Sequence, residues 1–115
     1  MWKTLFMADA QSIASADFSV GELIRHKRFE YRGVVVDVDP TFQLSEDWYD
    51  QVARSRPPKD APWYHVLVDG SDQMTYVAQR NLERDTIAEP IQHPLLEHFF
   101  EGFDGSRYVT AEIMN

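Results

Sequence analysis

The 115-residue sequence contains no cysteine. Disulfide bonds and thiolate-rich metal sites are therefore excluded, and because the absence fits a reducing compartment, we expect a cytoplasmic protein. Long apolar runs are also missing, since the run that begins at Leu5 ends at Ala8, before Asp9. This is shorter than the core of a signal peptide or a membrane span. We expect neither export nor membrane insertion, and Met7 is a second candidate translation start.

Basic residues are in the minority, with 11 Lys and Arg against 19 Asp and Glu and a net charge of −8 at pH 7. Such a chain has no general electrostatic attraction to nucleic acid, because phosphate contacts depend on Lys and Arg. A contact with nucleic acid or another partner must then be local, and two groups of residues are candidates for it. They are Arg25, Lys27, Arg28 and Arg32 with the neighbouring Tyr31, and Arg54, Arg56 and Lys59. The alternative is that both groups are simply solvated surface.

Signatures of catalysis are absent as well. The sequence has no Gly-x-Ser-x-Gly elbow, no Walker loop and no glycine-rich phosphate fingerprint. We therefore expect a protein that is not an enzyme and has no catalytic residue and no cofactor. His93 and Glu97 are spaced to share a helix face, with His98 adjacent, but a zinc site needs three or four ligands, so we expect no metal site. His26 and His65 fall on predicted strands and are interpreted as structural, with a pH-sensitive contact as the alternative.

The most strongly patterned stretch is Tyr31 to Pro40. Alternation in an extended chain places Val34, Val36 and Val38 on one face and Val35 with two aspartates on the other. The Asp-Pro pair ends the strand, because proline lacks the N–H that a ladder needs. The pattern predicts a half-buried strand that fixes the register of its neighbours.

Further strands are predicted at residues 18–27, 63–70, 74–78 and 82–86, with a single helical turn at 79–82. Leu44, Trp48 and Val52 recur every four residues, and Ser45 precedes two acids, which predicts a helix over Ser45–Ala53. A proline-rich insertion at 54–62 follows, a kind of segment that is often functional. A second helix is predicted over residues 93–100, with Gly102 as its stop.

Together these elements predict a mainly β protein, an SH3-like small β-barrel of about five antiparallel strands with a short helical insertion and a C-terminal helix. The predicted organisation is an N-terminal arm (1–17), a barrel domain with its C-terminal helix (18–100) and a tail (101–115). Tyr108, Val109 and Ile113 give the tail enough apolar character to add a strand.

Several ordered motifs resemble the YccV-like, or hemimethylated DNA-binding, family, which includes heat shock proteins of the HspQ type. The resemblance covers about residues 18–95 and excludes most of the arm and the tail. It rests on the runs Val20–Lys27, Tyr31–Pro40, Ser45–Trp48, Pro57–Leu67 and Tyr76–Leu82, with Glu89-Pro90-Ile91 and His93-Pro94 at its end.

The resemblance implies an SH3-like barrel and a cytoplasmic protein without enzymatic activity that self-associates as a trimer. It also implies two functions. One is regulation of protein degradation in the heat shock response, through turnover of the replication initiator and substrate choice by the Lon protease. The other is binding of hemimethylated DNA at the replication origin. The acidic composition favours the protein partner, since specific DNA binders usually carry a basic footprint.

Overall fold

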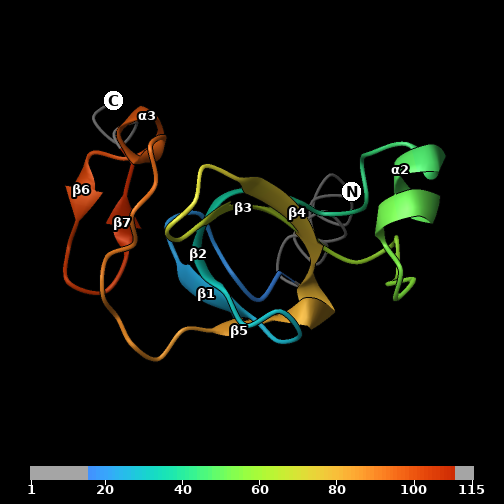
Figure 1. Cartoon of the computed structure of the whole chain (residues 1–115), viewed down its shortest axis with the longest axis horizontal. Helices are drawn as coiled ribbons and strands as arrows, with labels where there is room; N and C mark the ends of the chain where they lie inside the picture. The colour runs from blue at the N-terminus through green and yellow to red at the C-terminus, as the bar shows by residue number, and fades with distance from the viewer. Residues whose placement is uncertain (1–15, 111–115) are drawn as a thin grey trace, which may run out of the picture.

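The computed structural model describes residues 16–110, and its centre is a five-stranded antiparallel sheet (Figure 1). The strands are β1 (Leu23–His26), β2 (Arg32–Asp39), β3 (Trp63–Val68), β4 (Met74–Ala78) and β5 (Leu82–Arg84), and the 3-10 turn η1 (Gln79–Asn81) joins the last two. Their spatial order is β4-β3-β2-β1-β5, so β4 and β5 are the edge strands. The predicted mainly β class and the predicted turn at 79–82 are confirmed.

β1 begins later than the sequence pattern predicts. Gly21 has a φ of +95°, and the Glu22 N–H donates to the Ser19 carbonyl at 3.1 Å, so the chain turns immediately before Leu23. The prediction of a strand from residue 18 was wrong because this turn interrupts it. The predicted antiparallel hairpin of β1 and β2 is confirmed, and the basic residues 27 and 28 lie in its tip.

The valine alternation of β2 is interrupted by a bulge. Val35 and Asp37 pair with successive residues of β3, which leaves Val36 without a partner opposite. Val34 and Val36 therefore pack in one cluster, whereas Val35 and Val38 pack in another. The prediction that Val34, Val36 and Val38 share one face was wrong, because an inserted residue reverses the alternation that follows it.

Each face of the sheet has its own apolar cluster. The inner cluster consists of Phe18, Ile24, Val35, Tyr64, Val66, Val77 and Leu82. The C-terminal cluster consists of Leu23, Val34, Val36, Leu67, Ile91, Phe100 and Tyr108. β1 and β2 contribute side chains to both clusters, so parts of these strands are buried on both faces. Consecutive residues are apolar there instead of alternating with polar ones.

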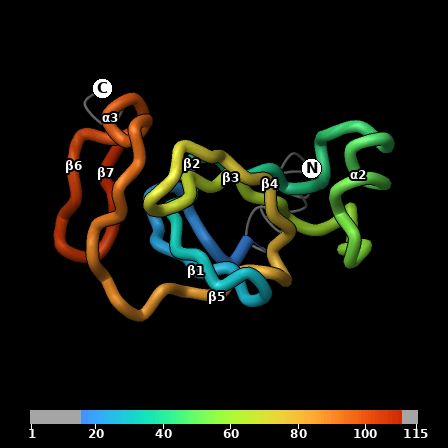
Figure 2. The backbone as a smooth tube through the Cα atoms, in the orientation of Figure 1, coloured from blue at the N-terminus to red at the C-terminus, as the bar shows by residue number. Residues whose placement is uncertain are grey.

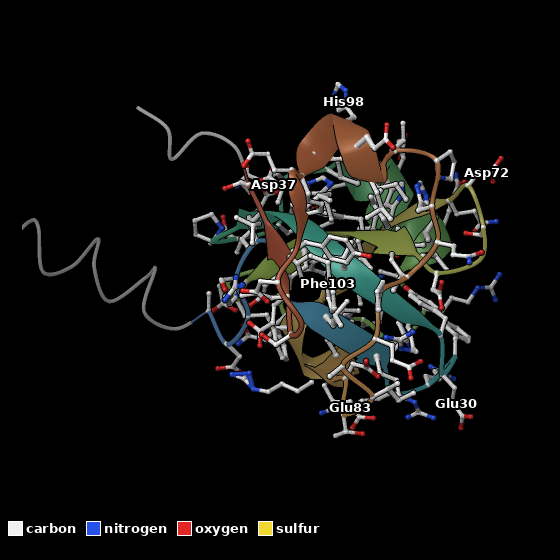
Figure 3. The ribbon with its side chains drawn as sticks, turned by 90° about the vertical axis from the view of Figure 1, so that its left-hand side faces the viewer. Glu30, Asp37, Asp72, Glu83, His98 and Phe103 are labelled. Carbon is white, nitrogen blue, oxygen red and sulfur yellow. The ribbon has the colours of Figure 1, made fainter. Side chains whose placement is uncertain are left out.

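The C-terminal segment covers one end of the sheet. It contains α3 (Leu96–Phe99) and a small hairpin of β6 (Gly102–Phe103) and β7 (Tyr108–Val109). The Tyr108 N–H donates to the Gly21 carbonyl at 2.8 Å, and its hydroxyl accepts from the Ile91 N–H at 2.9 Å. Figure 3 looks onto this end, with Phe103 over the middle of the face and Glu30, Asp37, Asp72 and Glu83 around its outline.

The predicted helix over 93–100 is reduced to the four residues of α3. His93 precedes it, with Nε2 2.9 Å from the Gln73 carbonyl and Nδ1 accepting from the Leu95 N–H at 3.1 Å. These bonds hold the chain in a turn rather than a helix at this point. The prediction that His93 and Glu97 share a helix face was therefore wrong.

The insertion after β2 forms α2 (Glu46–Val52) at the opposite end of the sheet (Figure 2). Ser45 caps it, accepting from the Trp48 N–H at 3.1 Å, as predicted. The buried face is different from the predicted one. Tyr49 and Ala53 are buried, whereas Leu44 and Val52 remain exposed.

The N-terminal arm lies mostly outside the described residues, and so does its Met7. The chain enters the described part beside η1, where the Asp17 N–H donates to the Gln79 side-chain oxygen at 2.8 Å. The far end of the tail, with Ile113, is also outside the described residues. No helix within residues 16–110 has the length and apolar character needed to cross a bilayer.

Candidate functional site: an apolar groove beside strand β4

A groove of about 920 Å³ lies between α2, β4 and the tip of the β1–β2 hairpin. All five residues of β4 line it, together with one side of α2 and the segment that follows α2. The lining residues are His26, Arg28, Phe29, Tyr31, Leu44, Trp48, Val52, Ala53, Arg54, Ser55, Pro57, Trp63, His65, Gln73, Met74, Thr75, Tyr76, Val77, Ala78 and Asn81. Segments far apart in sequence thus form one continuous surface.

Exposed apolar side chains are concentrated in this groove. Four of the six large apolar residues that are exposed in the described chain line it, namely Phe29, Leu44, Val52 and Met74. Phe29 is the most exposed of them, at 70%. Contiguous exposed apolar surface of this kind marks sites of interaction with a ligand or a protein.

An aromatic cluster holds α2 in place and forms one wall of the groove. Trp63 stacks on Tyr76 with ring centroids 5.2 Å apart, and Trp48 meets Tyr76 edge to face at 5.7 Å. The proline-rich segment closes this wall, because the Tyr49 hydroxyl donates to the Pro57 carbonyl at 2.6 Å. The Trp63 indole N–H donates to the next carbonyl at 3.0 Å. The wall is therefore a fixed surface.

The described part of the groove carries no negative charge of its own. Among residues 16–110, no Asp or Glu lines it, although the chain has 19 acidic residues. Arg28 and Arg54 line it, and within residues 16–110 neither forms an ion pair. The groove is thus an apolar and weakly cationic strip on an acidic protein, which suits a ligand that is apolar and negatively charged.

His26 organises the hairpin tip at one side of the groove. Its Nδ1 accepts from the backbone N–H groups of Arg28 and Phe29, at 3.1 and 3.0 Å. Its ring lies between Phe29 and Tyr31, with centroid distances of 4.7 and 5.1 Å. Burial, with a smaller contribution from the Arg28 charge, lowers the pKa of His26. The neutral imidazole is the form that can accept both bonds.

The remaining predicted contact residues fall into two sets. Lys27 is exposed at the same tip and, in the described chain, forms no ion pair. Tyr31 lines the groove, and its hydroxyl is 2.8 Å from the hydroxyl of Thr75, which also lines it. Burial raises the pKa of Tyr31, partly offset by that hydrogen bond. Arg28, Tyr31 and Arg54 therefore line the groove, and Lys27 lies at the hairpin tip beside it.

The other four predicted residues already have acidic partners. Arg25 bonds Glu83 at 2.9 Å, Arg56 bonds Asp50 at 2.9 Å, and Lys59 pairs with Glu46. Arg32 is the most enclosed, with Asp85 and Asp69 beside it and its side chain only 16% exposed. These positions favour structural roles over contact with a phosphate.

A cluster of possible metal ligands lies near the groove. Asp37, Asp39 and His65 place one ligand atom each within 4.8 Å of one another. Asp39 also accepts from the Tyr76 hydroxyl at 2.7 Å, and His65 Nε2 is 3.3 Å from Asp39. Burial, together with the bond to Asp39, raises the pKa of Tyr76 well above its usual range. Asp39 and His65 are thus members of a hydrogen-bonded network with Tyr76, whereas Asp37 accepts from the Val38 N–H. His26 and His65 both line the groove, but their rings pack on different residues, Phe29 and Tyr76 respectively.

Sequence reasoning missed Leu44, Val52, Phe29 and Met74 as site residues. The four-residue spacing of Leu44 and Val52 was the available signal, but it predicts only that the segment is a helix and not which of its faces is buried. The competing pair Tyr49 and Ala53 has the same spacing, and its contacts with Trp63 decide which face is buried.

Comparison with known protein families gives a match over most of the chain. The family model described as hemimethylated DNA-binding protein YccV-like matches residues 16–107. The match spans the whole five-stranded sheet, the α2 insertion and α3. The resemblance found in the sequence motifs is thereby confirmed, and the chain belongs to the YccV-like family of hemimethylated DNA-binding proteins.

Proposed function

We propose that this protein is an HspQ-like heat shock regulator of protein degradation, which influences turnover of the replication initiator and substrate choice by the Lon protease. It acts by binding and not by catalysis. The observation that carries the proposal is the apolar groove beside β4, which no acidic residue lines within the part of the chain that the structure describes. An adaptor must recognise protein segments, and such segments bury apolar side chains in grooves of this kind.

The composition of the groove favours a polypeptide over a nucleic acid. Three of the four exposed apolar side chains that line it in the described chain, those of Leu44, Val52 and Met74, offer no flat ring on which a base can stack, whereas the fourth, Phe29, does. The three predicted cations that lack an acidic partner in the described chain are few for a DNA backbone, whose affinity grows with the number of phosphates contacted.

The resemblance to the family also implies an SH3-like barrel, a cytoplasmic location and self-association, which we include in the proposal. The strand order β4-β3-β2-β1-β5 with η1 before β5 supports an SH3-like barrel. We further propose a cytoplasmic homo-oligomer, specifically a trimer. A small domain buries a modest share of its surface, so assembly would add stability and several copies of the groove.

The test is a degradation assay with purified Lon protease and a panel of substrates that includes the replication initiator. We expect the protein to change the rates of selected substrates and Val52→Glu to reduce that effect. Ile87→Glu is the matched control, because Ile87 is equally exposed, at 54%, but lies outside the groove. Unchanged rates across the panel, together with no capture of Lon or substrate by the immobilised protein, would overturn the proposal.

Binding of hemimethylated DNA is the second candidate. A specific observation favours it, since Lys27 and Arg28 stand without ion pairs within the described chain beside the exposed Phe29. Cations next to an exposed aromatic ring form a common contact with nucleic acid. A hemimethylated duplex should then shift at lower protein concentration than fully methylated and unmethylated duplexes of the same sequence.

A further inference from the structure

Strand β4 forms the rim of the groove along its whole length. It is an edge strand, and its five consecutive residues all line the groove. Successive side chains of a strand point to opposite faces, so a groove that meets all of them must follow the edge of the strand. The groove therefore exposes the backbone of β4 as well as its side chains.

The register of β4 on β3 shows which backbone groups face the groove. The Val68 N–H donates to the Gln73 carbonyl at 3.1 Å, and the Gln79 N–H donates to the Pro62 carbonyl at 3.0 Å. In an antiparallel ladder the hydrogen-bonded pairs alternate with non-bonded pairs. The backbone groups of Met74 and Tyr76 therefore point away from β3. Among residues 16–110, no other segment bonds to them.

The walls on the two sides of this edge are apolar. Leu44, Trp48 and Val52 belong to the wall on the α2 side, and Phe29 and Tyr31 belong to the wall at the hairpin tip. A strand added to β4 would point alternate side chains toward each wall. Such a strand would need apolar side chains facing both walls.

The charge of the groove specifies the ligand further. Arg28 stands at the hairpin tip and Arg54 after α2, and no acidic residue of the described range 16–110 lines the space. A ligand with a carboxylate near each arginine would complete two ion pairs that the described chain leaves unmade. Charge complementarity of this kind selects partners and fixes their register.

We propose that the groove binds an extended, acidic and apolar segment of a partner protein, which adds as a strand to the free edge of β4. Strand addition supplies affinity through backbone bonds to Met74 and Tyr76 and selectivity through the apolar walls. This inference rests on the proposed function in taking a protein as the partner. It goes beyond it by naming the kind of segment and the way in which it binds.

The test uses a fluorescein-labelled octapeptide in which leucine alternates with valine and a glutamate stands at each end, so that both faces of the extended peptide are apolar. Its binding to the full chain is followed by fluorescence anisotropy. Two further peptides carry N-methyl groups, one on the odd-numbered and one on the even-numbered residues. Only one of these sets faces β4 in a strand, so we expect one peptide to bind about tenfold or more weakly and the other to keep its affinity.

Protein variants and a charge swap locate the site. Val52→Glu should weaken binding of the octapeptide, whereas Ile87→Glu should not. Arg54→Glu should weaken the glutamate peptide and strengthen a peptide with lysine in place of glutamate. Equal effects of both N-methyl sets, or unchanged binding to Val52→Glu, would overturn the inference.

The outcomes separate this inference from the proposed function. Altered Lon degradation with equal effects of the two N-methyl sets rejects strand addition and leaves the degradation role standing. Selective loss with one N-methyl set and no change in degradation supports strand addition and rejects the role. Binding of a labelled synthetic peptide of residues 1–15, with no binding of the octapeptide, would assign the groove to the chain's own N-terminal segment and overturn the inference.

Discussion

The guanidinium of Arg32 and the carboxylate of Asp85 form an ion pair, with Nη2 3.0 Å from Oδ2 and the Asp85 side chain only 1% exposed. A second bond, from Arg32 Nε, reaches the same oxygen at 3.1 Å. The pair ties the start of β2 to the chain just beyond β5. It therefore connects a central strand of the sheet to the segment that leads to the C-terminal cluster.

Removing one partner of this pair should destabilise the fold. Arg32→Met leaves the Asp85 carboxylate buried and unpaired, and we expect a loss of about 3 kcal/mol in the free energy of unfolding. The double variant Arg32→Met with Asp85→Leu should recover much of that loss, because it leaves no buried charge. Urea denaturation measures both.

Arg28→Met is the control for the Arg32 variants. Arg28 is exposed and, in the described chain, has no acidic partner, so its replacement should change the unfolding free energy by no more than about 0.5 kcal/mol. If Arg32→Met were as stable as Arg28→Met, the structural role of the pair with Asp85 would be wrong.

The folded protein should lose stability as the pH falls below neutrality. The pKa of His26 is lowered in the fold, so above its unfolded value of 6.5 both states are neutral and the stability is complete. Below pH 6.5, His26 binds a proton in the unfolded state but stays neutral in the folded state. The free energy of unfolding therefore decreases as the pH falls toward the folded pKa. Urea denaturation at several pH values measures this slope.

His26→Asn should flatten that pH dependence, because its side-chain oxygen can still accept a hydrogen bond but does not titrate. His98→Asn is the control, since His98 is exposed on α3. An NMR titration in which His26 has a pKa at or above 6.5 would contradict the prediction.

The sequence was most informative where local chemistry alone decides the structure. The Ser45 cap and the acids that follow it predicted α2, and the β4 bounds match the predicted 74–78. These signals depend on neighbours within one turn or one strand. They do not depend on how distant segments meet.

Features set by distant contacts were not predictable in this way. The bulge at Val36 depends on the register with β3, which no local pattern reveals. The exposure of Val52 depends on whether Trp63 packs against one face of α2 or the other. The groove depends on these long-range contacts. Its two arginines were predicted from local charge clusters, whereas the exposure of its aliphatic residues could not be predicted without the contacts.

Gly21→Ala should destabilise the attachment of the C-terminal hairpin. A Cβ at Gly21 would lie 2.2 Å from the Tyr108 carbonyl oxygen, and its φ of +95° is unfavourable for any other residue. Gly70→Ala is the control, because Gly70 also has a positive φ but a Cβ added there would meet nothing within 4 Å. We expect backbone strain of about 1–3 kcal/mol in both variants and a further loss only in Gly21→Ala. If both variants lost the same stability, the Tyr108 backbone would be able to move away from the added Cβ without a loss of free energy, and the prediction would be wrong.

The salt dependence of DNA binding tests the second candidate function. If Lys27, Arg28 and Arg54 each neutralise one phosphate, the logarithm of the binding constant should fall against the logarithm of salt concentration with a slope of about −3. Lys27→Ala or Arg28→Ala should each reduce that slope by about 0.9. Arg25→Ala should reduce it less, because the Arg25 guanidinium already bonds Glu83 and Glu30. If Lys27→Ala and Arg28→Ala left the slope unchanged, the hairpin tip would not contact the DNA. The groove would then retain only its role toward protein segments.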